Sequence, residues 1–230
     1  MNHLSGVERL SNRFRVMRHG QSKANEAGVI VSQIENDRRG DYGLSELGVR
    51  QVRAAAAACA LPADTVICSS DFARARQTAQ IVRACLGTAE VVVTEALRER
   101  CFGDLEGSSS QNYARVWDAD EAGRGHADGG IEQAAAVLDR ATGFIADLEG
   151  RYCGRDILLV SHGDTLQILQ AGFLRMAPSR HRRLPHLDTA EIRELRLGET
   201  RLDRRGELGV RASSEVNPSL PVHARRCDNF

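Results

Sequence analysis

Short apolar runs alternate with longer amphipathic stretches along this 230-residue chain. A short continuous apolar run is typical of a buried strand, whereas apolar residues spaced three and four positions apart are typical of a helix. Strands that alternate with helical stretches favour parallel βαβ units, so the pattern predicts an α/β fold. The predicted strands are Phe14–Met17, Thr65–Cys68, Val91–Thr94, Ile157–Val160 and Ala190–Leu197.

Four helices are predicted between these strands, and their ends carry capping residues. Ser45 is a natural N-cap, and Ser70 or Asp71 can cap the next helix. Gly87 and Gly150 follow the last periodic residues of two helices, as glycines past a helix C-terminus do. The predicted helices run from Ser45 to about Cys59, from Ser70 to about Cys85, from Ile131 to Glu149 and from Asp164 to Arg175.

The remaining segments carry turn residues and little periodicity. Ser108–Gly130 is polar and glycine-rich, and one or two helical turns are expected around Tyr113–Trp117. A long excursion of this kind is usually a lid or a surface insertion, and we place it over the functional site. Gly198-Glu199 is expected to turn the last strand into a hairpin with Thr200–Leu202. Three further segments are expected to be irregular: a loose lead-in at residues 1–12, a loop at Glu26–Tyr42, and an extended or mobile tail at residues 204–230.

Composition and charge narrow the class of protein. Lys plus Arg equals Asp plus Glu, 31 each, so the formal net charge of zero gives no support to nucleic-acid or membrane binding. No apolar run approaches transmembrane length, and residues 1–11 lack the apolar segment of a secretory signal. The six cysteines form no Cys-x-x-Cys pair, and none lies at metal-ligand spacing from a histidine. We therefore expect a cytoplasmic protein with reduced thiols, and no pattern defines its oligomeric state.

Two of the predicted strands end in a histidine followed by a glycine. The first runs into Arg18-His19-Gly20 and the fourth into Ser161-His162-Gly163. Ligands of open α/β sheets bind outside the carboxyl ends of the strands, so adjacent strands would bring His19 and His162 into one crevice. Arg74 lies one turn into a helix that follows another strand end, so it can reach the same crevice. A guanidinium group binds phosphate oxygens with a planar fork of donors, and a neutral imidazole can attack phosphorus, so the pattern predicts phosphoryl chemistry.

Five motifs occur in a fixed order along the chain: Arg18–Asn25, Leu44–Gln51, Ser69–Asp71 with Arg74-Ala75 and Gln77–Ala79, the stretch from Leu97 to Gly107 around Glu99, and Ser161–Gly163. Together they resemble the histidine phosphatase superfamily, also called phosphoglycerate mutase-like, and indicate a phosphatase-type member. The resemblance covers roughly Arg13 to Leu197 and implies a three-layer α/β/α sandwich with a mostly parallel sheet. With the polar lead-in at residues 1–12 and the tail at 204–230, this predicts a catalytic domain at 13–203 with a variable cap segment at 108–130.

The same resemblance implies a role for each site residue. His19 would be the nucleophile of a phosphomonoester hydrolase and would carry the phosphoryl group of a small phosphorylated metabolite. Two arginines and a second histidine supply positive charge for phosphoryl transfer, so no metal or other cofactor is expected. The same positive field favours the neutral form of His19. The expected catalytic residues are His19, Glu99, His162, Arg18 and Arg74, and the expected substrate-binding residues are Arg18, Asn25, Arg74, His162 and Gly163.

The leaving alkoxide needs a proton, so a carboxylic acid at the mouth of the crevice is useful. The resemblance implies that Glu99 is this donor. On sequence alone Asp164, two residues after His162, is a rival. We interpret Asp164 instead as the N-cap of the helix that follows it.

A cofactor-dependent phosphoglycerate mutase is the main alternative, because it would use the same nucleophile. Mutases of this family carry a longer insertion between Glu99 and His162, with basic residues for the substrate carboxylate. Here Ser108–Gly130 is short, and its Arg115 and Arg124 lie among acidic residues, which favours the phosphatase. A non-catalytic scaffold is disfavoured because every expected catalytic residue is present. A metallohydrolase is disfavoured because two arginines beside the site would repel a cation.

Overall fold

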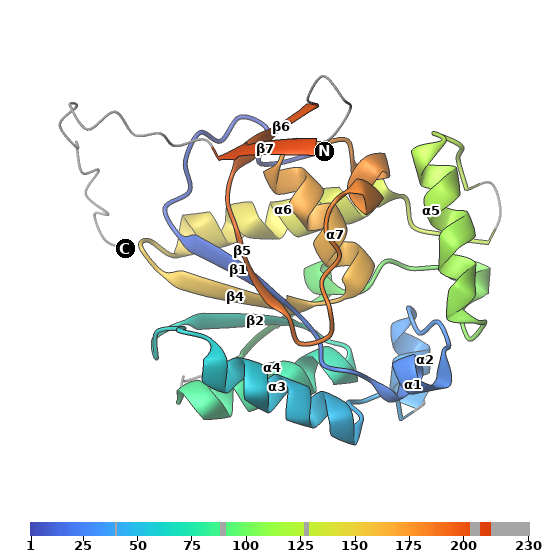
Figure 1. The fold of residues 1–230 in the computed structure, drawn as a ribbon, viewed down its shortest axis with the longest axis horizontal. Helices are drawn as coiled ribbons and strands as arrows, with labels where there is room; N and C mark the ends of the chain where they lie inside the picture. The colour runs from blue at the N-terminus through green and yellow to red at the C-terminus, as the bar shows by residue number, and fades with distance from the viewer. Residues whose placement is uncertain (40, 88–90, 127–128, 203–207, 213–230) are drawn as a thin grey trace.

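The computed structural model describes residues 1–39, 41–87, 91–126, 129–202 and 208–212. Five strands form its central sheet: β1 (Arg13–Arg18), β2 (Val66–Ser70), β3 (Val91–Thr94), β4 (Asp156–Ser161) and β5 (Ile192–Leu195). Their order in the sheet is β3-β2-β4-β1-β5 (Figure 1). Four strands run parallel and β5 pairs antiparallel with β1, so the prediction of a mostly parallel sheet is confirmed.

Helices cover both faces of this sheet. α3 (Glu46–Ala58) and α4 (Ala73–Leu86) lie on one face, and α6 (Ala134–Arg151) and α7 (Gly163–Phe173) lie on the other (Figure 1). The three-layer α/β/α architecture is therefore confirmed. The shorter helices are α1 (Lys23–Ala27), α2 (Ile34–Arg39), α5 (Tyr113–Glu121), and the 3-10 helices η1 (Glu95–Leu97), η2 (Gly103–Leu105), η3 (Ser110–Asn112) and η4 (Pro178–Arg183).

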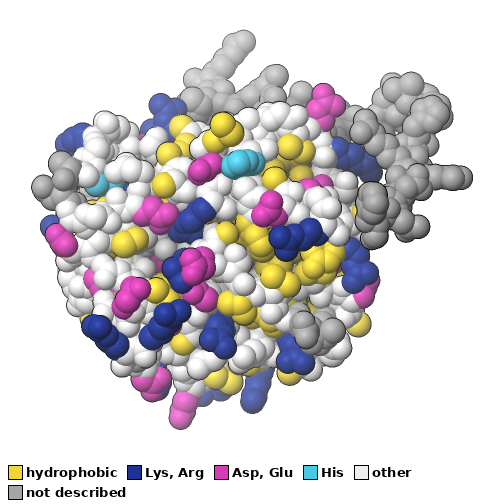
Figure 2. Space-filling view, turned by 180° about the vertical axis from the view of Figure 1, so that it is seen from behind, with side chains coloured by type: hydrophobic (Ala, Val, Ile, Leu, Met, Phe, Trp, Pro, Cys, Tyr) yellow, Lys and Arg dark blue, Asp and Glu magenta, His cyan; other side chains and the backbone are white. Residues whose placement is uncertain are grey.

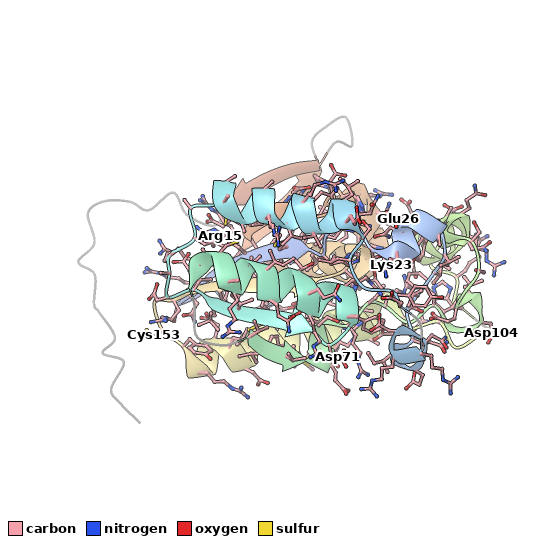
Figure 3. The ribbon with its side chains drawn as sticks, turned by 90° about the horizontal axis from the view of Figure 1, so that it is seen from below. Arg15, Lys23, Glu26, Asp71, Asp104 and Cys153 are labelled. Carbon is pink, nitrogen blue, oxygen red and sulfur yellow. The ribbon has the colours of Figure 1, made fainter. Side chains whose placement is uncertain are left out.

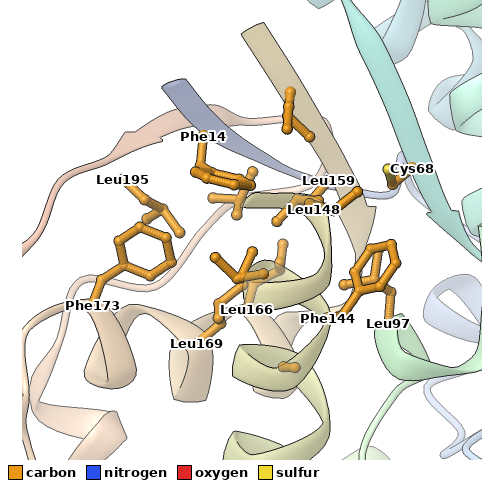
Figure 4. Close-up of a cluster of buried hydrophobic side chains, with 14 of the residues drawn as sticks. Phe14, Cys68, Leu97, Phe144, Leu148, Leu159, Leu166, Leu169, Phe173 and Leu195 are labelled. Carbon is orange, nitrogen blue, oxygen red and sulfur yellow. The ribbon is translucent and has the colours of Figure 1, made fainter. Parts of the chain in front are cut away.

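Strand alternation divides the buried side chains between two cores. Every residue of β4 is buried, as expected of a central parallel strand with helices on both faces. The core against α6 and α7, drawn in Figure 4, takes Phe14, Val16, Ile157 and Leu159 from the sheet. The core against α3 and α4 takes Met17, Ile67, Leu158 and Val160. The apolar runs in the sequence are therefore continuous because both faces of these strands are covered.

Two segments expected to be irregular are held by packing. Residues 1–12 are not a loose lead-in, because the side chain of Leu4 is 1% exposed and belongs to the larger core. The expected loop at Glu26–Tyr42 contains α2, whose Ile34 is buried against Phe72. Each segment has too few apolar residues to show helical or strand periodicity. Its ordered conformation is therefore evident only from its tertiary contacts.

The N-terminal caps of α3 and α4 differ in origin. Ser45 caps α3 as predicted, with its side chain accepting a hydrogen bond from a backbone N–H of the first turn. The prediction that Ser70 or Asp71 caps α4 is wrong. The carboxylate of Asp37, on α2, accepts a hydrogen bond from the backbone N–H of Ala73 at 2.8 Å. A residue distant in sequence therefore satisfies a donor that the neighbouring side chains leave free.

Two glycines at predicted helix ends behave differently. Gly87 closes α4 in the left-handed conformation, with φ +69°, as predicted. Gly150 does not end α6, which continues one residue past it. The start of α6 is also later than predicted, because Ile131 pairs with Phe102 in a β-bridge and the helix begins at Ala134.

The chain after β5 forms a second, two-stranded sheet. β6 (Gly198–Leu202) pairs antiparallel with β7 (Leu208–Ala212). The turn predicted at Gly198-Glu199 is wrong, because these residues begin β6. The partner of β6 is β7, which lies in the segment that was expected to be an extended tail. The rest of that expected tail, 204–207 and 213–230, lies outside the described residues.

The cysteines are not all reduced. Cys153 is in a disulfide, so the expectation of reduced thiols is wrong at this position. Figure 3 shows Cys153 at the end of the molecule opposite Asp104. The free cysteines of the described part are Cys59, Cys68, Cys85 and Cys101.

The surface shows the balanced charge of the composition. On the face seen in Figure 2, the basic and acidic side chains are interspersed, and neither sign dominates. Among the described residues, no helix is both long and apolar enough to cross a membrane.

Candidate active site

The two His-Gly junctions meet at the carboxyl edge of the sheet. β1 lies beside β4 in parallel register, with Arg18 opposite Ser161. The residues that follow, His19 and His162, therefore leave the sheet side by side, with ring centroids 5.2 Å apart. A cavity of about 220 Å³ opens here, and the predicted residues that line it are Arg18, His19, Asn25, Arg74, Glu99 and Gly163.

His19 is held with one ring nitrogen toward the backbone and the other toward an arginine. Its Nδ1 lies 2.7 Å from the carbonyl oxygen of Gly20, which can only accept a hydrogen bond. Nε2 accepts a hydrogen bond from Nε of Arg74 at 3.2 Å. Both contacts require the tautomer with the proton on Nδ1, which leaves a lone pair on Nε2. Burial and the charges of Arg74 and Arg18 hold the pKa of His19 well below its ordinary value, so the ring is neutral at neutral pH.

Gly20 supports this arrangement by its lack of a side chain. A Cβ atom at Gly20 would lie 2.6 Å from the carbonyl oxygen of Gly48, at the start of α3. The reciprocal contact is as close, since a Cβ at Gly48 would overlap the carbonyl of Gln21. The two glycines therefore let α3 pack against the turn that presents His19.

Arg74 reaches the cavity from the first turn of α4, as predicted. Its side chain is buried, and Nη2 donates to the carbonyl oxygen of Val31 at 2.8 Å. Asp37 lies behind it, with Nη1 to Oδ1 at 3.5 Å. Nη1 makes no hydrogen bond and is buried, so the guanidinium retains a donor for a ligand.

His162 is fully buried beside the ring of His19, and unlike the other predicted site residues it does not line the cavity. Its Nε2 lies 2.9 Å from the hydroxyl of Ser70, at the end of β2. Its Nδ1 is buried and has no hydrogen-bond partner. If the Ser70 hydroxyl donates to Nε2, Nδ1 carries the ring proton and is a free donor to an anion. Burial, followed by the charge of Arg74, lowers the pKa of His162 well below its ordinary value.

Arg18 closes another side of the cavity. Nη1 donates to the carbonyl oxygen of Leu187 at 3.0 Å and lies 2.7 Å from Nε2 of His186. Nε is buried without a partner. Gly163, at the start of α7, lies next to this guanidinium, and a Cβ atom there would make an ordinary van der Waals contact with it at 3.5 Å. Three buried nitrogens, on Arg18, Arg74 and His162, therefore lack a hydrogen-bond partner at or next to the cavity.

Glu99 lies in the irregular stretch after β3, where the sequence places two glycines. Its Oε1 accepts hydrogen bonds from the backbone N–H groups of Arg100 at 2.9 Å and Thr165 at 3.2 Å. Arg140, on α6, fixes the main chain of this stretch by donating to the carbonyl oxygens of Ala96 and Arg98. Burial, and then the charge of Asp164, raises the pKa of Glu99. A carboxyl group with a raised pKa can hold a proton for a leaving group.

Asp164 does not cap α7, so that interpretation is wrong. The N-cap position is His162, without a side-chain cap, and the Asp164 carboxylate is buried. It accepts hydrogen bonds from Nε1 of Trp117 at 2.9 Å and from Nη1 of Arg100 at 3.2 Å, and it lies 2.8 Å from Nε2 of His181. Burial opposes its ionisation, but these hydrogen bonds and charges outweigh burial and lower its pKa. Asp164 therefore joins α7 to α5 and η4.

Arg100 also joins α5 to α7, because it contacts Asp120 on α5 and Asp164 on α7. The side chain is fully buried, and its guanidinium donates to both carboxylate oxygens of Asp120 at 2.6 and 3.0 Å. Its Nε donates to the carbonyl oxygen of Glu132 at 2.6 Å. A paired, hydrogen-bonded charge of this kind holds α5 against the domain.

Asn25 lies on the exposed rim of the cavity, as the resemblance implies. Its side-chain oxygen accepts a hydrogen bond from the backbone N–H of Ser22 at 3.0 Å. The Ser22 hydroxyl in turn accepts from the backbone N–H of Asn25, which completes a capping box at the start of α1. The Asn25 side chain is thereby positioned at the mouth of the cavity.

Several residues that line the cavity were not predicted from the sequence, and four of them have aromatic or basic side chains. Tyr113 and Trp117 come from α5, so the prediction that Ser108–Gly130 lies over the site is confirmed. α5 is a full nine-residue helix rather than one or two turns. An aromatic pair four residues apart in a polar segment was the available signal. We call Arg18, His19, Arg74 and His162 the inner pocket, and Tyr113, Trp117, Arg182 and His186 the outer pocket.

No group of three or more His, Cys, Asp or Glu side chains is placed to hold a metal ion in the described ranges of the chain. Positive charge for a phosphoryl group is available from Arg18 and Arg74 of the inner pocket. The expectation that no metal is needed stays a prediction.

Comparison with known proteins agrees with the geometry. The model of the histidine phosphatase superfamily, branch 1, matches residues 14–205. A metal-independent phosphoserine phosphatase from Arabidopsis thaliana is 28% identical over 70% of this chain and 67% of its own length. A 2,3-bisphosphoglycerate-dependent phosphoglycerate mutase from Sinorhizobium fredii is 26% identical over 70% of this chain and 78% of its own. The structure of a mycobacterial glucosyl-3-phosphoglycerate phosphatase with VO3 is 25% identical and superposes with a TM-score of 0.67, covering 87% of this chain and 97% of that one.

Proposed function

This chain belongs to the histidine phosphatase superfamily and is an enzyme of the histidine phosphatase class, and we propose that it hydrolyses small phosphomonoesters through a phosphohistidine on His19. One observation supports this most strongly. Nε2 of His19 carries a lone pair close to buried nitrogens of Arg18, Arg74 and His162 that have no partner. A phosphoryl group supplies the oxygens that these donors need.

In the first step, Nε2 of His19 attacks phosphorus and the bond between phosphorus and the ester oxygen breaks. The three non-bridging oxygens accept hydrogen bonds from the inner pocket, and a phosphoryl oxygen replaces His19 Nε2 as the partner of Arg74. Glu99 gives its proton to the departing oxygen, so the product leaves as a neutral alcohol. Positioning and electrostatic stabilisation supply most of the rate in such a transfer.

In the second step, water attacks the phosphohistidine in line with the P–N bond. The Glu99 carboxylate takes a proton from this water, and His19 regains its lone pair as phosphate forms. The enzyme returns to its starting state, since the proton given in the first step is recovered in the second. No metal enters either step, and the metal-independent name of one relative supports this.

The second step also separates a phosphatase from a mutase. A mutase must exclude water and hold an acceptor hydroxyl in line with the phosphoryl group. The described part of the Ser108–Gly130 segment is polar, and the relatives include enzymes named as phosphatases and as mutases. We propose phosphatase as the activity and mutase as the alternative.

The deciding experiment measures both activities on one preparation. We expect phosphate release from a panel of phosphorylated metabolites, and negligible interconversion of 2- and 3-phosphoglycerate even with a bisphosphoglycerate primer. Isomerisation much faster than hydrolysis would replace the phosphatase by the mutase.

The cavity also bounds the substrate. Its volume of about 220 Å³ is below the roughly 300 Å³ at which pockets for drug-sized ligands begin, so a small metabolite fits best. We propose no nucleic-acid or membrane partner, in line with the balanced charge. A cytoplasmic location is also proposed from the sequence, although the disulfide at Cys153 does not support it. Fractionation of the native cell would test that location.

A further inference from the structure

The outer pocket contains an arginine that the proposed chemistry does not use. Arg182, on η4, lines the cavity together with Arg18, His19 and Arg74. Arg182 follows both Glu99 and His162 in the chain, so it lies outside the variable segment between them. Its charge is therefore additional to the two arginines assigned to the phosphoryl group.

Arg182 is held in place by groups that do not neutralise it. Its guanidinium carbon lies 3.6 Å from the centroid of the Trp117 ring, a cation–π contact that fixes the guanidinium on α5. Nη1 donates to the side-chain oxygen of Gln167, on α7. Both partners are uncharged, so Arg182 keeps a full positive charge on a pocket wall.

No described carboxylate forms an ion pair with Arg182. The negative charge of Asp164 acts on Arg182. However, the carboxylate oxygens of Asp164 already accept hydrogen bonds from Arg100 and Trp117 and contact His181. Burial lowers the pKa of Arg182, and the negative charge of Asp164 offsets only part of this effect. A half-buried guanidinium without a counter-ion favours an anion from the ligand.

The neighbouring His186 does not supply a second charge. Its Nε2 lies 2.7 Å from Nη1 of Arg18, which can only donate, so Nε2 is the acceptor. Burial, and then the charges of Arg18 and Arg182, lowers its pKa. The outer pocket therefore offers one positive charge, which matches a carboxylate better than a second phosphate with nearly two negative charges.

From this placement we propose that Arg182 binds a carboxylate on the leaving-group side of the substrate, so that the preferred substrates are small carboxylated phosphomonoesters. This rests on the proposed phosphatase function. The inner pocket takes the phosphoryl group, and the planar guanidinium of Arg182, stacked on Trp117, takes the carboxylate at the cavity mouth. A single charge-assisted contact of this kind selects among substrates without taking part in the chemistry.

The test compares esters that differ in one group. 3-Phosphoglycerate is paired with the glycerol phosphate of the same configuration at carbon 2, and O-phosphoserine is paired with O-phosphoethanolamine. We expect kcat/KM of the wild-type enzyme to be about tenfold or more higher for the carboxylated member of each pair. Arg182→Gln should remove this preference, mainly by raising KM for the carboxylated member. It should leave kcat/KM for the member without a carboxylate within about threefold of the wild-type value. Arg182→Lys should restore part of the preference because it keeps the charge.

The matched control is Arg180→Gln, an exposed arginine on the same 3-10 helix. It should leave the preference unchanged. Equal hydrolysis of both members by the wild-type enzyme, or an equal loss for both in Arg182→Gln, would overturn the proposal while the phosphatase function stands. Since the wild-type comparison needs no variant, it decides the matter even if Arg182→Gln fails to fold. Absence of turnover with every ester, including p-nitrophenyl phosphate, would instead contradict the proposed function itself.

Discussion

The inner and outer pockets share one cavity but are built in different ways. Inner-pocket side chains come from strand ends or the first turn of a helix packed on the sheet, and His19, Arg74 and His162 are almost fully buried. Outer-pocket side chains come from α5 and from the chain at and after η4, and they are partly or fully exposed. α5 is tied to the domain by a few specific contacts, including those of Arg100 and Asp164.

This difference separates reaction from recognition. Groups that touch a phosphoryl group need fixed geometry, which a packed sheet supplies. Groups that recognise the rest of the substrate lie on segments that can vary without disturbing the core. The comparison predicts that changes in the inner pocket reduce rate for all substrates, whereas changes in the outer pocket alter stability or selectivity.

The largest effect is expected from His19→Ala. Removal of a covalent nucleophile should lower kcat by about 10⁴-fold or more. Enzyme quenched during turnover should carry acid-labile, base-stable phosphate on one histidine, and this label should be lost in the variant. His3→Ala, a surface change beside Asp139, is the control. A label on His162 would exchange the roles of the two histidines.

The next effect is expected from Glu99→Gln. Loss of a general acid should slow alkyl phosphates by about 10²- to 10⁴-fold, because a poor leaving group needs its proton. p-Nitrophenyl phosphate should be affected far less, since its leaving group departs without protonation. Glu8→Gln, at an exposed position, controls for the change of charge. An equal loss with both kinds of ester would remove Glu99 from this role.

The pH profile sharpens the same assignment. The nucleophile must be deprotonated, and the pKa of His19 is lowered, so kcat/KM should stay high to well below pH 6.5. The acid must be protonated, and the pKa of Glu99 is raised, so activity should fall at a pH above the ordinary value of 4.5. Glu99→Gln should abolish this falling limb. A falling limb that persists in the variant would point to another acid.

A moderate effect is expected from Asp164→Asn, which weakens the contacts that join α7 to α5 and η4. Because Asp164 is buried and contacts Arg100, Trp117 and His181, we expect a loss of about 1–3 kcal/mol in the free energy of unfolding and a higher KM. The pKa of Asp164 is lowered in the fold, so its contribution is present above its unfolded pKa of about 3.9 and is lost as the pH falls through the folded value.

Denaturant unfolding at neutral and acid pH measures this difference. Asp118→Asn, at an exposed position of α5, should change stability by less than about 0.5 kcal/mol. A selective loss of activity toward alkyl phosphates in Asp164→Asn, with stability intact, would transfer the role of proton donor to Asp164.

The smallest effect is expected from chelation. The inner pocket supplies its own positive charge through Arg18 and Arg74, so treatment with EDTA should leave phosphate release unchanged within error. Rates before and after chelation, and after addition of Mg²⁺, Mn²⁺ or Zn²⁺, check this. Activity that disappears and then returns with a metal would contradict the proposed mechanism.

The inner pocket could be predicted because its signals are local. A strand that ends in Arg18-His19-Gly20 and a second that ends in His162-Gly163 show the residue type, the neighbouring turn and the element in a few positions. A general rule for open α/β sheets then predicts that the two histidines share a crevice if their strands are adjacent, and the structure pairs β1 with β4. The prediction for Asp164 was wrong for the opposite reason, since a residue at a helix start looks like a cap until its partners on other elements are known.

The sequence by itself determined the layered α/β fold and the positions of His19 and the inner-pocket arginines at strand and helix ends, because strand and helix periods and His-Gly junctions are properties of adjacent residues. Tertiary structure alone decided the cap of α4 by Asp37, the role of Asp164 and the position of Arg182 over Trp117. In these three contacts the partners are 36, 47 and 65 positions apart in the sequence, respectively. Which side chain meets which partner across such distances is determined by how helices pack, and no local pattern records it.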